Sequence, residues 1–279
     1  MYGFADTRKA VKDGIVDVGM IGTLWEESDL PLQNVTYYTP FATDDHRLII
    51  KIFDDLNQNL PPLRDSWHRQ NLVPLSTLVT DSYDIYATRR IKSMDDIRNV
   101  RLNAPGTSAN WLKGIGAIPV DGGLTTYYTN IQTGVTQGAL SFASGIGPAR
   151  VHEVAPQLTR IGFGAMAFGA VAVNKRFFDN LPAEVQAAFI EAGRLTSERH
   201  GEHVAKTAEE WLDKMQAEGL QIHELPDAEK KRWVDSLPNL VEPWLQAHGE
   251  DAKVVLRAYF DKLREHGVEP LRAWDEAAR

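Results

Sequence analysis

The segment 95–106, "DDIRNVRLNAPG", places a permanent cation in what reads as a short strand. The apolar residues that alternate along this strand are Val100, Leu102 and Ala104. Arg101 stands among them, and Pro105 ends the strand. A buried guanidinium is costly without a partner, so the pattern predicts one. Two partners stay open: an Asp of the neighbouring helix, or the carboxylate of a ligand, gripped through two parallel hydrogen bonds. Ligands of α/β sheets bind beyond the carboxyl ends of strands, which favours the ligand slightly.

The other motifs that could do chemistry fit structural roles better. "GFGAMA" at 162–167 matches G-x-G-x-x-A, but a strand follows it where a dinucleotide site needs a helix. "FASGIG" at 142–147 lacks the first glycine of a nucleophile elbow. His200 and His203 lie one helical turn apart, yet a solvated face is their expected role on a helix rich in Lys and Glu. No acid–base pair or nucleophile assembles, so we predict no catalytic residue, no metal, no cofactor and no enzyme.

Composition excludes several classes of partner. The chain has 279 residues, 43% of them hydrophobic and 24% charged, with a formal net charge of −8 and no Cys. This balance argues against a nucleic-acid partner, which would need clustered Lys and Arg. No apolar run reaches the ~20 residues of a membrane span, and no signal peptide is visible. We expect a soluble protein that is not itself inserted in a membrane.

Strands alternate with helices throughout, which predicts an α/β fold with mostly parallel sheets. Ser93 and Asp96 match a capping box at the start of a short helix. The longest helix is expected at 182–219, from a first-turn Pro to a terminal Gly, and would be about 50 Å long. The other predicted helices end near 14 or cover 45–59, 63–70, 107–114, 125–133, 227–248 and 251–266, and the predicted strands cover 16–21, 72–79, 84–87, 100–104, 116–120, 136–140, 157–162, 166–173 and 219–225.

A helix of that length exceeds one small domain, so we expect it to span two lobes with a cleft between them. We place the first lobe at 1–78 plus 167–205 and the second at 79–166 plus 206–279. Residues 31–42 are expected to form an irregular loop.

Several segments together resemble one known family. "MDDIRNVRLNAPG" resembles the "eDlkGlKiRvp" segment of DctP-type solute-binding proteins of TRAP transporters, and "GAIPV" resembles their "GA.pv". "YYTNIQTGVTQG" resembles "E.Y.aLQtGvvDG", and "VKDGIVDVGMIGT" followed by "TYYTPF" resembles "v..G.vDig…lPF". "AVAVNKRFFDNLPAEVQAAFIEAG" also resembles the family pattern, so the likeness covers residues 8 to 220 in order.

The resemblance implies a two-lobed fold like that of periplasmic binding proteins, with a long helix spanning both lobes. It implies a periplasmic protein that binds an organic carboxylate in the cleft and delivers it to a TRAP membrane permease, without catalysis. Family members carry a signal peptide and a strand–helix unit before "G.vDig", so the chain reads as N-terminally truncated. Two alternatives stay open: an extracytoplasmic sensor domain of a signalling system, and an α/β enzyme acting on a carboxylate.

The resemblance also implies ligand-binding residues. Arg101 would take the place of the family's Arg in "KiR", which salt-bridges the ligand carboxylate. The other positions that match ligand-contacting segments are Leu124, Ser141, Gly22, Trp25, Asn103 and Tyr128. Thr126 and Gln137 stand where the family has Glu and Asp. Because Leu124 and Trp25 are apolar, we hypothesise a monocarboxylate with an aliphatic or aromatic tail as the ligand.

Overall fold

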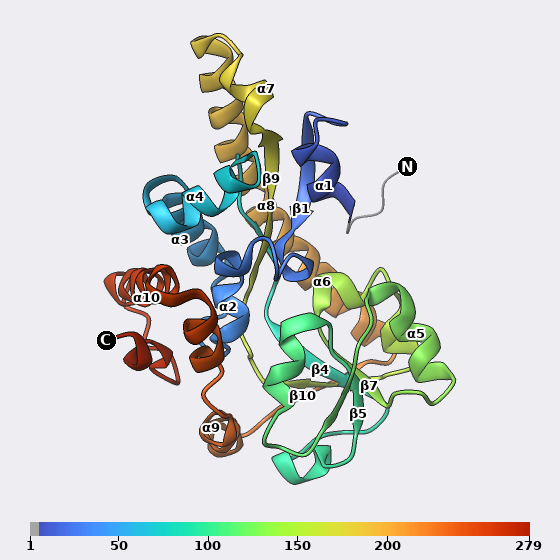
Figure 1. Cartoon of the computed structure of the whole chain (residues 1–279). Coiled ribbons are helices and arrows are strands. Elements are labelled where there is room, and N and C mark those ends of the chain that lie inside the picture. The colour runs from blue at the N-terminus through green and yellow to red at the C-terminus, as the bar shows by residue number, and fades with distance from the viewer. Residues whose placement is uncertain (1–5) are drawn as a thin grey trace.

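The computed structural model describes residues 6–279, which form two lobes, each built around a β-sheet (Figure 1). The helices are α1 (Thr7–Lys12), α2 (Val35–Tyr38), α3 (His46–Asn59), α4 (Pro61–Arg69), α5 (Leu124–Gln132), α6 (Ala143–Ile146), α7 (Lys175–Asp179), α8 (Ala183–Ala217), α9 (Asp227–Ser236) and α10 (Val241–Glu265). The strands are β1 (Val18–Gly22), β2 (Leu72–Pro74), β3 (Leu78–Val79), β4 (Tyr83–Ala87), β5 (Arg101–Asn103), β6 (Ile118–Val120), β7 (Gly138–Phe142), β8 (Gln157–Arg160), β9 (Ala167–Asn174) and β10 (Gln221–Glu224).

Short 3₁₀ helices fill several of the connections. They are η2 (Thr23–Trp25), η3 (Pro31–Asn34), η4 (Met94–Ile97), η5 (Gly106–Leu112), η6 (Val151–Glu153) and η7 (Trp274–Ala278). The loop expected at 31–42 is therefore partly helical, as η3 and α2. The helix predicted at 45–59 ends before Pro61, as α3 does, and the next helix, α4, begins at Pro61 and not at 63, because the fixed φ of proline suits the first turn and its missing N–H would have no partner there.

The sheets contain more antiparallel pairing than the sequence predicts. In the first lobe, β1, β2 and β3 all pair antiparallel with β9. In the second lobe the order is β10-β8-β4-β7-β5-β6, and β4 runs antiparallel to both of its neighbours. The expectation of mostly parallel sheets is therefore wrong. The physical reason is that β9 and β4 each enter their sheet from the opposite lobe, against the direction of the local strands.

The long helix α8 spans both lobes, as its length predicts. It contacts α3 and β3 in the first lobe and α6 in the second. Glycine permits the closest approach: a Cβ at Gly193 would lie 2.0 Å from the carbonyl oxygen of Leu75. Nearby, the Ser197 hydroxyl accepts a hydrogen bond from the Thr77 N–H at 2.9 Å. This helix, the two crossing segments around 80–82 and 161–166 and the connection between α9 and α10 join the lobes.

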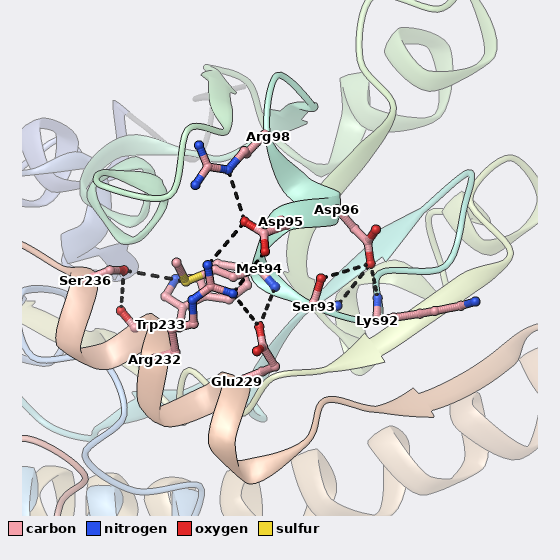
Figure 2. Close-up of polar contacts among 10 residues, drawn as sticks. All are labelled: Lys92, Ser93, Met94, Asp95, Asp96, Arg98, Glu229, Arg232, Trp233 and Ser236. Carbon is pink, nitrogen blue, oxygen red and sulfur yellow. Dashed lines mark hydrogen bonds and ion pairs between the residues drawn. The ribbon is translucent and has the colours of Figure 1, made fainter.

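The capping box predicted for residues 93–96 is present in η4 (Figure 2). The Ser93 N–H donates to the Asp96 carboxylate at 3.0 Å. Two further contacts fix α9 to this turn: Arg232 donates to Asp95 at 3.1 Å, and the Met94 N–H donates to Glu229 at 2.9 Å (Figure 2). α9 therefore belongs with the second lobe.

The C-terminal helix α10 returns to the first lobe. It packs on α3 and α4, and the residues of its buried face include Val255, Leu256, Tyr259, Phe260 and Leu263. The predicted boundary, which gave all of 206–279 to the second lobe, is wrong for this helix. The chain crosses back after α9 because α10 carries an apolar face that the helices of the first lobe bury.

Candidate ligand-binding site between the lobes

A cavity of about 470 Å³ lies between the two lobes. Its lining residues are Leu24, Trp25, Tyr37, Thr80, Tyr83, Pro105, Gly123, Leu124, Thr125, Tyr127, Ser141, Phe142 and Phe168. The first lobe supplies η2, α2 and β9, and the second supplies β4, β7 and the start of α5. None of these thirteen lining residues is charged. The cavity is thus an aromatic chamber with hydroxyl groups and backbone amides as its polar groups.

The floor of the cavity is a packed aromatic cluster that joins the lobes. Tyr37 of α2 stacks on Trp111 of η5, with ring centroids 5.9 Å apart and planes within 14°. The Trp111 indole N–H donates to the Tyr37 carbonyl oxygen at 2.7 Å. Tyr83 meets both rings edge-on, and its hydroxyl lies 3.5 Å from that of Tyr37. These contacts hold the phenol groups in fixed positions beneath the cavity.

The phenol groups of the cavity stay protonated. Burial raises the pKa of Tyr37, Tyr83 and Tyr127 well above the ordinary value. The Asp81 carboxylate raises the pKa of Tyr83 further. The Asp121 carboxylate does the same for Tyr127. At neutral pH these side chains are therefore neutral groups that can donate or accept a hydrogen bond.

The N-terminus of α5 opens onto the cavity. Gly123 is its N-cap residue, and no side chain caps this end of the helix. Gly123, Leu124 and Thr125 all line the cavity. The first N–H groups of a nine-residue helix carry a partial positive charge, so this end of α5 favours a negative group.

Arg101 does not lie in this site. Its side chain is exposed, its Nε donates to the Val135 carbonyl at 2.7 Å, and its Nη2 donates to the Gly134 carbonyl at 2.8 Å. The expectation of a buried guanidinium that awaits a ligand is wrong. The physical reason is that residue 101 begins a three-residue strand, where the side chain can fold over the turn between α5 and β7 into solvent.

The comparisons with known proteins bear on what this cavity is for. A family model described as "Bacterial extracellular solute-binding protein, family 7" (DctP) matches residues 1–248. The chain belongs to this family. Within the described residues 6–279, no helix combines the length and apolar character needed to cross a bilayer. In the same range, no group of three or more His, Asp or Glu residues is placed to hold a metal ion.

Two curated relatives are periplasmic binding proteins. The C4-dicarboxylate-binding periplasmic protein DctP of Rhodobacter capsulatus is 28% identical over 149 residues, which are 53% of this chain and 44% of that protein. The ectoine-binding periplasmic protein TeaA of Halomonas elongata is 22% identical over 266 residues, 93% of this chain and 77% of that protein. The match thus spans less than half the length of the R. capsulatus protein.

Solved structures show the same two-lobed fold. A marine metagenome TRAP solute-binding protein specific for pyroglutamate superposes with a TM-score of 0.80 at 18% identity, covering 94% of this chain and 84% of that one. The ectoine-binding protein of H. elongata also gives a TM-score of 0.80, at 21% identity and with 92% and 84% coverage. The fold expected from the resemblance is confirmed by these likenesses.

Asn103, on the same strand as Arg101, is also engaged by other residues of the protein. Asn103 is fully buried; its Nδ2 donates to Thr136 Oγ1 at 2.8 Å, and its Oδ1 accepts from Asn130 at 2.9 Å. The side chain of Asn103 therefore bonds to the protein itself.

The remaining predicted residues divide into two groups. Leu124, Ser141 and Trp25 line the cavity, and their contact with a ligand stays a prediction. Gly22 and Tyr128 are not among its lining residues. The lining residues that sequence reasoning missed include Tyr37, Tyr83, Tyr127, Phe142 and Phe168. The only available signal was the proximity of Tyr127 to Leu124 on one helix face, since the others come from separate elements.

Proposed function

We propose that this chain binds a small organic acid in the interlobe cavity, in the periplasm, and passes it to a TRAP-type membrane permease. Membership of the solute-binding family supports the binding role, and the periplasmic relatives that bind acids support the compartment and the ligand class. The observation that carries the proposal is the chamber of about 470 Å³ with walls from both lobes. Such a chamber suits one small molecule held between two rigid bodies.

The acid group would be held without a cation. The uncapped N-terminus of α5 offers backbone N–H groups, and the Ser141 hydroxyl lies on the neighbouring strand β7. Together these can receive one carboxylate as a helix N-terminus receives an anion. The apolar body of the ligand would then lie against rings such as Phe142 and Phe168.

These walls favour a monocarboxylate over a dicarboxylate. A second carboxylate would lose its hydration against aromatic rings, with no charged partner among the lining residues. Burial of an unpaired charge is costly, so a dicarboxylate of the same length should bind more weakly.

Delivery to the permease would use closure of the lobes. The crossing segments around 80–82 and 161–166 are short, and bending there would move one sheet relative to the other. A ligand that touches both Trp25 and Leu124 would favour the arrangement in which the two walls face each other across the cavity.

A blocking substitution tests the site. Thr125→Trp places a large ring at the exposed mouth of the cavity, whereas Thr129→Trp adds the same ring one turn further along α5, outside the lining. We expect Thr125→Trp to abolish the binding, measured by calorimetry, of whichever acid native mass spectrometry finds with the purified protein. Thr129→Trp should bind as the wild type does. Full binding by Thr125→Trp would place the ligand elsewhere and defeat the proposal.

A further inference from the structure

The charged side chains that act on Tyr83 and Tyr127 of the cavity are acidic, Asp81 and Asp121 respectively. Asp121 lies just before α5 at the mouth, where its carboxylate accepts from the Gly106 N–H at 3.5 Å. Asp81 follows the lining residue Thr80, and its carboxylate accepts from the Ala143 N–H at 2.7 Å and from the Ser144 hydroxyl at 2.5 Å. The lining itself contributes no Lys or Arg. The surroundings of the cavity therefore repel a net anion and attract a positive group.

The walls of the cavity also favour a positive group. Six of the lining residues are aromatic: Trp25, Tyr37, Tyr83, Tyr127, Phe142 and Phe168. Ring faces attract cations through their quadrupoles, most of all cations that have been taken out of water. A primary ammonium is strongly hydrated and pairs best with a carboxylate, whereas the side chains of these walls offer only neutral hydroxyl oxygens as acceptors. An amidinium or a quaternary ammonium is weakly hydrated, and a box of rings suits it.

We propose that the acid bound here is a zwitterion, a small molecule that carries an amidinium or a quaternary ammonium close to its carboxylate. This inference rests on the proposed function, because it describes the ligand of the same cavity. The two charges of such a molecule match two adjacent features. The start of α5 receives the carboxylate, and the rings together with Asp121 receive the cation. The molecule is neutral overall, so a site without Lys or Arg can bury it.

A matched pair of ring acids tests the proposal. Ectoine carries a cyclic amidinium beside its carboxylate, whereas pyroglutamate is an acid of similar size whose ring is a neutral lactam. We expect calorimetry to show that the wild-type protein binds ectoine at least tenfold more tightly than pyroglutamate. Pyroglutamate binding equally or more tightly would overturn the inference while leaving the proposed function in place.

Two variants separate the charge contribution from general packing. Asp121→Asn removes the acidic group at the mouth and should reduce the preference for ectoine several-fold. Phe168→Leu keeps an apolar side chain but removes the aromatic ring. It should weaken the binding of ectoine more than the binding of pyroglutamate. Glu184→Gln is the control, because it removes an exposed acid from the first turn of α8, outside the cavity lining. It should leave the preference for ectoine over pyroglutamate unchanged. An unchanged preference in both Asp121→Asn and Phe168→Leu would count against the zwitterion.

The ligand that co-purifies decides the remaining case. If neither ring acid binds, native mass spectrometry followed by fragmentation reads the charge groups of the molecule held by the protein. A carboxylate with an amidinium or quaternary ammonium supports the inference, and a simple anion overturns it. Failure of every organic acid to bind or co-purify would instead defeat the proposed function, together with the inference that rests on it.

Discussion

The interlobe cavity and the groove between α3 and α8 are similar in size and opposite in chemistry. The cavity has about 470 Å³ and no charged lining residue, whereas the groove has about 350 Å³. The charged residues that line the groove are Arg47, Lys51, Asp54, Arg194, Glu198 and Glu202. A search for a carboxylate site by charge alone would select the groove.

The difference lies in how the polar groups are already satisfied. In the groove, Arg194 donates to Glu191 at 2.9 Å and to Glu198 at 3.2 Å, on the surface of the same helix. Such exposed pairs are satisfied by each other and by water, so they create no demand for a ligand. The cavity instead offers buried rings and an uncapped helix end, whose interactions a ligand can complete. The density of charge is therefore a poor marker of the binding site.

A large effect is expected in the groove and concerns stability. Ser197 is buried; its hydroxyl accepts from the Thr77 N–H and donates to Asp54, each at 2.9 Å. Ser197→Ala leaves that N–H without its partner and should lower the free energy of unfolding by about 2 kcal/mol. Ligand affinity should not change. Denaturant unfolding and calorimetry check the two results, with Thr196→Ala on the exposed side of α8 as the control. A tenfold loss of ligand affinity in Ser197→Ala would instead indicate that the ligand binds in the groove.

The junction between the lobes predicts a pH dependence. Burial raises the pKa of Asp84 to about 7, although its carboxylate accepts from the N–H groups of Ile161 and Gly162. Asp44 raises the pKa further, and Arg160 lowers it. In the unfolded chain this carboxyl ionises near pH 4, so the native state binds more protons between pH 4 and pH 7. Stability should therefore fall as the pH rises through that window.

Asp84→Asn tests this dependence, because an amide oxygen can accept the same two hydrogen bonds. Above pH 7 the variant should be more stable than the wild type by about 4 kcal/mol, the free-energy equivalent of about three pKa units, and the two should converge near pH 4. Thermal melts from pH 4 to pH 8 provide the measurement. Parallel curves for the two proteins would show that Asp84 does not titrate in this range.

The aromatic wall predicts the next largest effect, on binding. Phe168→Ala should reduce the affinity for the ligand at least tenfold, which corresponds to about 1.4 kcal/mol, because it removes a ring that the ligand would cover. Arg194→Ala in the groove is the matched control and should leave affinity unchanged. Calorimetry with the co-purified ligand gives both values. The reverse result, a loss in Arg194→Ala alone, would break the comparison between the two regions.

The smallest effect is expected for Arg101. Its guanidinium is exposed and bonded to the carbonyl oxygens of Gly134 and Val135, so Arg101→Ala should change ligand affinity less than twofold. The loss of two exposed hydrogen bonds should cost less than about 1 kcal/mol of stability. A tenfold loss of affinity would restore this side chain as the partner of the ligand carboxylate.

The sequence predicted the local features well. Its Pro and Gly signals indicated a helix from 182 to 219, and the structure has α8 at Ala183–Ala217. The capping box of Ser93 and Asp96 is confirmed. Family motifs gave the fold and placed Leu124 beside what proved to be the cavity. Each of these depends on residues close together in the chain, where backbone preference and spacing carry the information.

Long-range features were out of reach. The direction of β4 and β9 depends on the lobe from which each strand enters, and no local pattern records it. The aromatic chamber gathers Tyr37, Tyr83 and Phe168 from three separate elements, so no spacing could group them.

The amino-acid sequence by itself determined the two-lobed α/β family, the helix that spans both lobes and the absence of Cys chemistry. Only the tertiary structure decided which polar groups face the ligand. Arg101 and Asn103 occupy equivalent positions on one strand, yet the first is exposed and the second fully buried. A side chain's solvation is set by neighbours brought from elsewhere in the chain, and so is its freedom to bind a ligand.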